Sequence, residues 1–173
     1  MPLVIDATPA GPSSNSYVLL SEANTYHTER LQTEVWDAAD DATKNISLVM
    51  ATRLMDQMLI WDQYPTTDTQ ALQWPRTGVL AASLLVEIGT FEIPKELKWA
   101  TSEFARQLMA SDVTANNDIE AQGITSLSAG SVSLSFKDSF KVKVVPDAVT
   151  FLLPSWWFTV RGQKSGIRNL MRA

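Results

Sequence analysis

The chain has 173 residues, a formal net charge of −5, no cysteine and a single histidine, His27. This length favours one domain with its own core, and the missing cysteines exclude disulfides, thiolate catalysis and thiolate metal sites. There is no GxSxG motif for His27 to serve and no carboxylate loop such as DxDxDG, so we expect an ordinary surface or boundary histidine and no enzyme, cofactor or metal. No secretory leader and no apolar run of about 18 residues is visible, which argues against export and a membrane span.

The charges are divided unevenly along the chain. Residues 1–136 hold 7 Lys/Arg and 17 Asp/Glu, a net charge of −10, whereas residues 137–173 hold 7 Lys/Arg and 2 Asp/Glu, a net charge of +5. An acidic body repels a phosphate backbone, and a basic end attracts nucleic acid or an acidic protein. The basic end is therefore the part where we expect a charged partner to bind.

Three stretches have the periodicity of amphipathic helices, and they cover about residues 21–33, 42–60 and 94–110. Ser21 is the expected N-cap of the first helix, and Asp40 or Asp41 is the expected N-cap of the second. Pro94 suits the first position of the third helix, where its missing N–H has no cost.

Residues 70–78, between the second and third helices, suit neither a helix nor a central strand. Pro75 fixes its own φ and pushes Trp74 toward extended geometry, and Arg76 is available to bond nearby carbonyls or carboxylates. We predict that Trp74, Pro75 and Arg76 form a structural wedge that closes one end of the core.

Two nearby features leave alternatives open. Residues 79–88 are mostly apolar and fit either a short buried helix or an arm packed on a neighbouring chain. Trp99 lies roughly 200° around the helix from Leu97, so it points away from the inward stripe. It either meets another element of the same chain or lies in a subunit interface, where indoles are enriched.

The period of the pattern changes after residue 122. Apolar residues alternate with Ser and Thr over residues 123–136, which predicts a β-hairpin, and alternate with lysines over residues 140–144, which predicts a further strand. We expect this hairpin region to extend over about residues 123–145. A short helix that Pro146 opens and Pro154 stops follows it.

Residues 155–173 have the composition of an extended arm that orders on a partner. Three consecutive aromatic residues cannot all face one core, and the remainder has too little apolar area to offset its ordering entropy. The partner can be single-stranded nucleic acid, a membrane interface or an acidic groove of another protein, or the arm can cap its own subunit. The expected partner-binding residues are Trp156, Trp157, Phe158, Arg161, Lys164, Arg168 and Arg172.

These elements predict a mainly α fold. We expect a small helical bundle with a β-hairpin and short strands near the C-terminus and an extended C-terminal arm. Residues 1–154 form the single helical domain in this prediction, and residues 155–173 form the arm.

Four blocks of sequence resemble a protein family of tailed bacteriophages. Residues 16–26 (SYVLLSEANTY) are similar to its "SYVsleEAdaYf" opening, and residues 51–56 (ATRLMD) are similar to its "ATRxLD" helix. Residues 70–78 (QALQWPRTG) resemble its "QaLxWPRxG" loop, and the helix start at residues 93–100 resembles its "iPxxvkxA" pattern. The blocks occur in the family's order, and the similarity is looser beyond about residue 122.

The family has two descriptions, which imply different functions. As head-to-tail connector (adaptor) proteins, its members resemble small subunits of a dodecameric ring below the portal, with C-terminal arms that clasp portal subunits. That description implies the portal, other copies of the chain and a downstream tail or neck protein as partners, and genomic DNA that passes without sequence-specific binding. It places the protein in the virion neck after synthesis in the host cytoplasm. The other description is that of DnaT-like single-stranded DNA-binding proteins.

The charge distribution favours the connector description. A single-strand binder needs a cationic groove to replace the counterions of the phosphates, whereas this body is acidic. An acidic body suits a channel through which DNA slides, and a basic aromatic arm suits anchoring to a neighbouring protein. The sequence therefore predicts a connector, with single-stranded DNA binding as the alternative.

Overall fold

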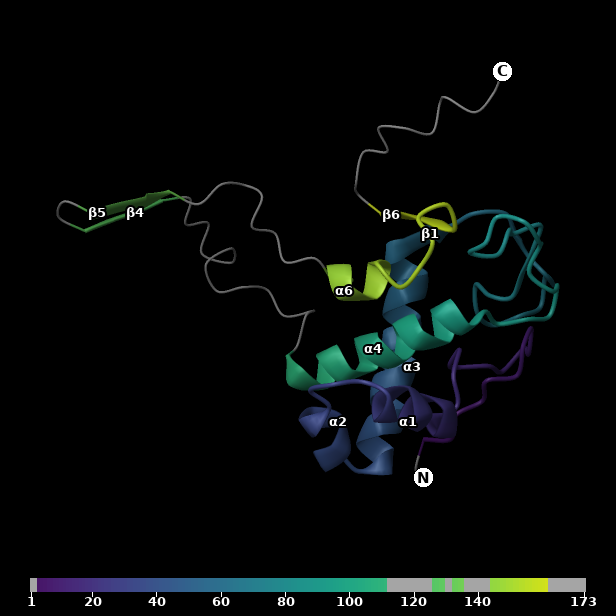
Figure 1. Cartoon of the computed structure of the whole chain (residues 1–173), viewed down its shortest axis with the longest axis horizontal. Helices are drawn as coiled ribbons and strands as arrows, with labels where there is room; N and C mark the ends of the chain where they lie inside the picture. The colour runs from purple at the N-terminus through teal and green to yellow at the C-terminus, as the bar shows by residue number, and fades with distance from the viewer. Residues whose placement is uncertain (1–2, 112–125, 130–131, 136–143, 162–173) are drawn as a thin grey trace, which may run out of the picture.

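Two long helices cross at the centre of the computed structural model, which describes residues 3–111, 126–129, 132–135 and 144–161 (Figure 1). Helix α3 spans Asp41–Met58 and helix α4 spans Lys95–Ala110. Both lie close to the ranges that the apolar periodicity predicts. Their contact is the most extensive between any two described elements, so it forms the framework on which the other segments pack.

Each long helix begins where the local chemistry favours a helix start. The Asp40 carboxylate accepts the backbone N–H of Thr43 at 2.8 Å, which satisfies one of the free donors of the first turn of α3. Pro94 directly precedes α4. The fully buried faces that meet between the helices include Leu48, Ala51 and Met55 of α3 and Leu97, Ala100 and Phe104 of α4.

The first predicted helix, over residues 21–33, ends early, and a second short helix follows beyond its predicted end. Helix α1 spans Leu20–Thr28 and helix α2 spans Glu34–Ala38, and both pack on α4. The N–H of Leu19 donates to the Glu22 carboxylate at 2.9 Å, which fixes the start of α1. Gln32 lies between the helices with φ = +60°, a conformation that a continuous right-handed helix excludes. None of the helices in the described ranges has the length and apolar character that crossing a bilayer requires.

Three antiparallel two-stranded ladders occur in the described part of the chain. Strand β1 (Leu59–Trp61) pairs with β6 (Phe158–Val160), β2 (Tyr64–Pro65) with β3 (Arg76–Thr77), and β4 (Ser126–Ala129) with β5 (Val132–Ser135). The β4–β5 pair lies apart from the helices and within the range of the predicted hairpin (Figure 1). The short helix α6 (Asp147–Thr150) packs on α4. Residues 136–143, which include most of the further predicted strand, lie outside the described residues.

The prediction of a small helical bundle is wrong, because irregular segments close much of the core. Residues 59–93 contain only short strands and turns, yet they bury Trp61, Trp74 and Val79. Large indoles on a loop fill volume that further long helices fill in a bundle. The described fold is a crossed helix pair covered by short helices on one side and by a long irregular segment at one end (Figure 1).

Residues 79–88, for which a buried helix was one alternative, turn back on themselves instead. The N–H of Ala81 donates to the carbonyl of Val86, and the N–H of Ile88 donates to the carbonyl of Val79, both at 2.8 Å. These bonds make a tight hairpin without a helical turn.

The chain also returns to the globule after Pro154. The N–H of Asp62 donates to the carbonyl of Trp157, and the N–H of Arg161 donates to the carbonyl of Met58, both at 2.8 Å. Residues 155–161 are therefore packed on the globule, so an extended arm does not begin at residue 155. Residues 162–173 lie outside the described residues.

Candidate functional site

Three of the four blocks that carry the family resemblance meet at one buried polar pair. Tyr17 from the first block donates its hydroxyl to the carboxylate of Asp56 from the second block. The N–H of Gln73 donates to the same carboxylate at 3.1 Å, and the N–H of Trp74 donates to the Tyr17 oxygen at 3.3 Å. The pair thus fixes the loop of residues 70–78 to α3.

Burial controls the protonation of this pair. It raises the pKa of Asp56 to about 6, although the hydrogen bonds from Tyr17 and Gln73 act in the opposite direction. Burial and the nearby Asp56 carboxylate raise the pKa of Tyr17 well above its ordinary value, so the hydroxyl stays protonated and donates. A shifted carboxyl pKa is common at catalytic sites. Here, however, both side chains bond to each other and to the backbone, which is the arrangement of a structural pair.

Arg76 stabilises the same loop by donating hydrogen bonds to backbone carbonyls. Its side chain is buried, and the guanidinium donates to the carbonyl of Asp62 at 2.6 Å, to that of Gln73 at 2.9 Å and to that of Gln63. A planar group with five donors can bind several carbonyls at once. Because these donors are directed at the chain itself, Arg76 is not available to a phosphate.

An aromatic cluster lies beside this loop. The ring centroid of Trp74 is 5.7 Å from that of Trp61 and 5.2 Å from that of Trp157, and Trp61 is 6.1 Å from Phe158. The peptide bond between Trp74 and Pro75 is cis, and the Trp74 side chain is 1 % exposed. The cluster joins β1, the loop of residues 70–78 and β6 into one apolar unit.

The three aromatic residues expected to bind a partner have different environments. Trp157 is 1 % exposed and donates its indole N–H to the carbonyl of Leu80 at 2.8 Å, and Phe158 is half-buried in β6. Trp156 is 38 % exposed. Trp157 lies in the core of its own chain, so it is not available to fill a pocket on a partner as expected.

Only one of the four cations expected on the arm lies in the described residues. Arg161 is exposed, and its Nε donates to the carbonyl of Gln57 at 2.9 Å. Lys164, Arg168 and Arg172 lie outside the described residues, so their expected role stays a prediction.

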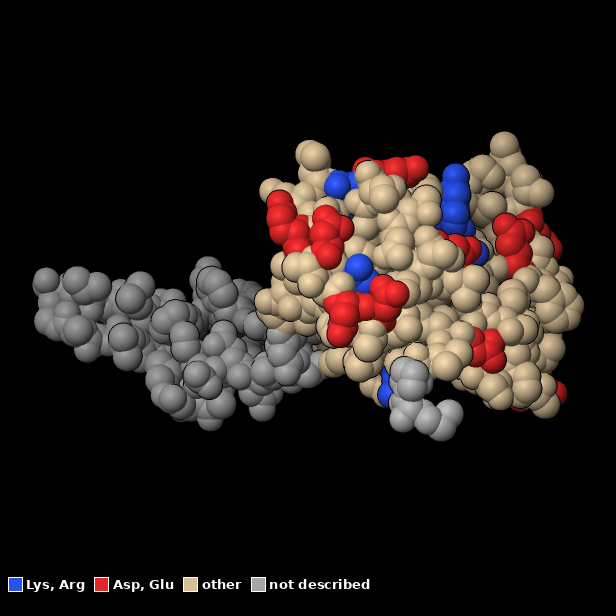
Figure 2. All heavy atoms as spheres, turned by 90° about the horizontal axis from the view of Figure 1, so that it is seen from below, with Lys and Arg blue, Asp and Glu red and all other residues tan. Residues whose placement is uncertain are grey.

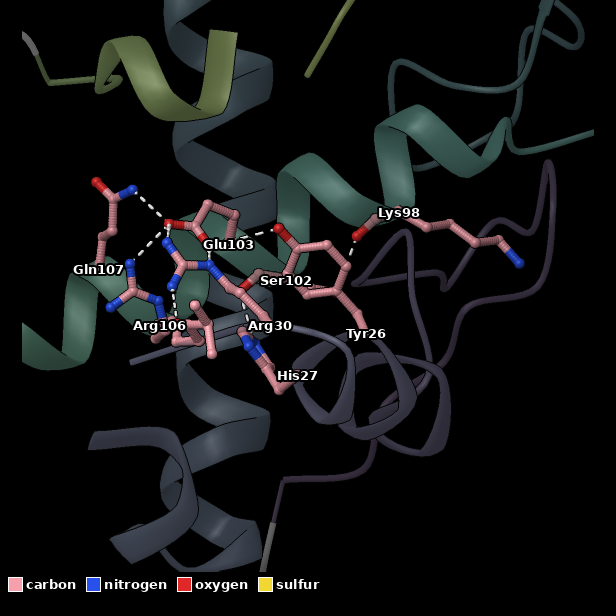
Figure 3. Close-up of polar contacts among 9 residues, drawn as sticks. Tyr26, His27, Arg30, Lys98, Ser102, Glu103, Arg106 and Gln107 are labelled. Carbon is pink, nitrogen blue, oxygen red and sulfur yellow. Dashed lines mark hydrogen bonds and ion pairs between the residues drawn. The ribbon is translucent and has the colours of Figure 1, made fainter. Parts of the chain in front are cut away.

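A buried charge cluster joins α1 to α4 (Figure 3). The Glu103 carboxylate contacts Arg30 at 2.6 Å and Arg106 at 2.7 Å, and it accepts a hydrogen bond from Gln107 at 2.8 Å. Burial works against the charge of Glu103, but the hydrogen bonds from Arg106 and Gln107 and the charges of both arginines outweigh it and lower its pKa. The cluster uses two cations of the globule for internal pairing.

His27 lies beside this cluster and is buried, which corrects its expected surface or boundary position. Its Nε2–H donates to the carbonyl of Ser102 at 3.2 Å, and its ring centroid is 4.2 Å from that of Trp36. Burial lowers the pKa of His27 to about 4, so the ring is neutral near pH 7. It packs from α1 against α2 and α4.

Trp99, for which a contact within the chain and a subunit interface were the two alternatives, is 39 % exposed on α4. The Lys95 ammonium lies 5.3 Å from the centroid of its ring. No partner chain is present, so the subunit contact stays a prediction.

The surface of the described globule is acidic. The described residues include 8 Lys/Arg and 15 Asp/Glu, and the face in Figure 2 shows several acidic groups with few basic ones between them. Arg30 and Arg106 pair with Glu103, Lys98 pairs with Glu22 at 2.5 Å, and Arg76 is buried. Among the residues that the structure describes, no group of three or more His, Asp or Glu side chains could hold a metal ion. The described globule therefore has an excess of acidic groups, and half of its described cations are already bound within the chain.

The sequence missed the two polar clusters because their members are far apart along the chain. Tyr17 and Asp56 are separated by 39 residues, and Arg30 and Glu103 by 73. One signal was present, since Tyr17 and Asp56 both belong to blocks of the family resemblance.

The comparisons with known proteins give one match. The model of a family described as "Putative DnaT-like ssDNA binding protein" matches residues 1–173. No curated protein and no solved structure matches significantly. The description names single-stranded DNA and no virion connector, so the sequence-based preference for a connector receives no support from it. Because the match extends over the whole sequence, the chain belongs to the DnaT-like single-stranded DNA-binding family.

Proposed function

We propose that the protein binds single-stranded DNA through its basic C-terminal part, and that the acidic globule serves as the scaffold of that part. Residues 137–173 carry seven of the fourteen Lys/Arg and only two acids, and this observation carries the proposal. Neutralising phosphates with Lys and Arg releases counterions, which is the main source of affinity in sequence-independent DNA binding. Family membership supports the same function.

Exposed aromatic rings next to the basic part supply the second element of such a site. Phe151 is 83 % exposed and Trp156 is 38 % exposed, and both precede Arg161 within the last described segment. Bases stack on exposed aromatic rings with little sequence preference, and each such contact contributes about 1–3 kcal/mol. The acidic globule disfavours contact with the backbone elsewhere.

A titration with a fluorescent oligothymidylate tests the proposal. We expect the full chain to bind this oligonucleotide more tightly than a duplex of equal length, because only unpaired bases can stack. Trp156→Ala should weaken binding roughly 5-fold or more. Trp99→Ala is the matched control, since Trp99 is equally exposed but lies on α4, and its affinity should equal that of the wild type. Equal losses in the two variants, or no binding by the full chain, would contradict the proposal.

A connector subunit is the second candidate, and the acidic globule favours it. In that function the globule faces passing DNA without retaining it, and the C-terminal residues hold a portal or neck protein in the virion. The discriminating test is pull-down of a purified portal ring by the full chain, in parallel with the oligonucleotide titration. Portal capture without binding of single-stranded DNA would favour the connector, and the reverse result would favour the DNA-binding function.

A further inference from the structure

An apolar surface covers the irregular end of the globule, between α3 and α4. We define this loop surface as the large hydrophobic residues of segment 64–91 that are at least 40 % exposed. They are Tyr64, Leu80, Leu84, Leu85, Val86 and Phe91. Single exposed aliphatic residues are normal on a soluble protein, but several in one short segment indicate an interaction surface.

Hydrogen bonds hold these residues in a fixed arrangement. The hairpin of residues 79–88 closes on itself through its backbone, and the hydroxyl of Thr66 donates to the carbonyl of Thr90 at 2.5 Å, which connects the segments that carry Tyr64 and Phe91. Leu84 adopts φ = +59° in the turn, a conformation that leucine rarely adopts. Leu84 and Leu85 are thereby presented at the tip of the hairpin instead of turning into the core.

The charge of this end of the globule specifies the chemistry of its partner. Arg76 is the one basic residue of segment 59–93, and it is buried and bonded to carbonyls. Asp68, Glu87 and Glu92 are exposed in the same segment. The right-hand end of the globule in Figure 2 accordingly shows uncharged and acidic surface. Such a surface complements a segment that combines cations with aliphatic side chains.

The last twelve residues of this chain have that composition. Residues 162–173 carry three Lys/Arg and no acid, together with Ile167, Leu170 and Met171. The segment starts from Arg161, which is fixed to the end of α3, and Trp157 four residues earlier bonds to Leu80 at the base of the hairpin. Twelve extended residues span up to about 40 Å, so the loop surface is within reach of the tail.

We propose that residues 162–173 dock on the loop surface of their own chain and that single-stranded DNA competes for them. The aliphatic side chains of the tail cover the hairpin tip, and its cations lie near Glu87 and Glu92. Docking holds the tail on the acidic globule in the absence of DNA, and a phosphate backbone displaces it. The docking is inferred from the exposed apolar residues of the loop surface and the composition of residues 162–173. The competition with DNA rests in addition on the proposed function.

The absence of native cysteine makes a direct test possible. The full chain with Ser83→Cys and Asn169→Cys is placed in a glutathione redox buffer, and the intramolecular disulfide is followed on a non-reducing gel. Ser83 is an exposed turn residue outside the loop surface, so both docking partners stay intact. We expect rapid formation of the disulfide. Adding Leu85→Ser and Val86→Ser should slow it about tenfold or more, since the apolar contact is lost while the tether is unchanged.

The matched control is Leu31→Ser in the same cysteine pair, because Leu31 is 85 % exposed and Leu85 is 86 % exposed. Leu31 lies between α1 and α2, so its replacement should leave the rate unchanged. Equal rates with and without the Leu85→Ser and Val86→Ser changes would overturn the docking. Disulfide-linked dimers in place of the internal bond would overturn it as well, because they identify a second copy as the occupant.

The competition has its own readout in the same assay. Oligothymidylate at saturating concentration should slow the disulfide about tenfold, and an unchanged rate despite tight DNA binding would refute the competition. If the chain binds no DNA but Leu85→Ser and Val86→Ser still slow the disulfide, the docking stands and the proposed function fails.

Discussion

At the scale of single residues, the side chains that most resemble an active site are structural. Asp56 is a buried carboxyl whose pKa burial raises to about 6, and it lies against the hydroxyl of Tyr17. The other oxygen of the Asp56 carboxyl accepts a hydrogen bond from the N–H of Gln73. The pair therefore connects the loop of residues 70–78 to α3, and it should be tested through stability instead of catalysis.

The first prediction concerns Asp56. Its pKa in the folded protein lies above the unfolded value near 3.8, so its contribution to stability is complete below about pH 4 and is lost as the pH rises through about 6. Asp56→Asn removes this titration. The difference in unfolding free energy between wild type and variant should shrink by on the order of 3 kcal/mol between pH 4 and pH 7. Urea unfolding at several pH values measures it, and a pH-independent difference would show that the carboxyl is not buried as described.

His27 should show the opposite dependence. Its pKa in the folded protein is lowered to about 4, so unfolding takes up a proton as the pH falls below about 6.5 and stability decreases down to about pH 4. His27→Gln keeps a donor for the carbonyl of Ser102 and removes the titration. The variant should therefore lose less stability than the wild type between pH 7 and pH 4. Parallel curves for the two proteins in thermal unfolding would contradict the buried neutral ring.

The two neighbouring tryptophans test the corrected position of the C-terminal segment. Trp157→Ala should lower the unfolding free energy by about 3–5 kcal/mol, because a buried indole leaves a cavity and an unpaired carbonyl at Leu80. Trp156→Ala removes a ring that is 38 % exposed and should cost less than about 1 kcal/mol. Similar small losses in both variants, measured by urea unfolding, would return Trp157 to the role of a partner-binding residue.

At the scale of elements, one carboxylate of α4 holds the segment that directly follows α1. Glu103 pairs with Arg30, two residues after the end of α1, and with Arg106 within α4 (Figure 3). Water partly screens these two ion pairs, since the side chains of Arg30 and Arg106 are 28 % and 15 % exposed. Removing the carboxylate nevertheless leaves both cations without their partner in a poorly solvated place.

Glu103→Gln should therefore destabilise the protein by about 2–4 kcal/mol. Hydrogen exchange should become faster in α1 than in α3, because the segment directly after α1 loses its ionic contact while α3 keeps its apolar one. Glu96→Gln, on the same helix but outside the cluster, is the control and should be nearly neutral. Uniform acceleration over both helices would argue against a local role for the cluster.

How far the elements could be predicted depended on whether their signal was local. The ranges near α3 and α4 followed from apolar steps along each helix, together with Asp40 and Pro94 at their starts. The break at Gln32 had no such signal, because a positive φ in a glutamine reflects the surrounding packing. The hairpin of residues 79–88 was missed as well, since a short apolar run does not distinguish a helix from an exposed turn.

The candidate site was predictable only in part. The composition of the arm suggested partner binding by its aromatic residues, yet Trp157 is held by Trp74 and Leu80, which are 83 and 77 residues away in sequence. Such contacts are set by tertiary packing and leave no periodic pattern. The charge division, by contrast, was visible in the sequence, and the acidic described globule agrees with it.

At the scale of the whole molecule, the proposed function assigns one task to the acidic globule and another to the basic C-terminal part. Half of the described cations of the globule, Arg30, Arg76, Lys98 and Arg106, lie in internal contacts, and its surface is acidic and partly apolar. In this proposal, the C-terminal part supplies the charges that phosphates require. This division is the central claim, and it predicts that DNA affinity depends on the tail and on salt.

The most direct measurement is the salt dependence of oligothymidylate binding, compared between the full chain and a chain that ends at Arg161. Fluorescence anisotropy between 50 and 200 mM NaCl gives the slope of log Kd against log salt concentration for each protein, at about 0.7 per phosphate contact on a single strand. We predict weaker binding by the shorter chain and a slope smaller by about 2, since it lacks Lys164, Arg168 and Arg172. Equal affinity and equal slope for the two chains would place the DNA contacts on the acidic globule and contradict the account.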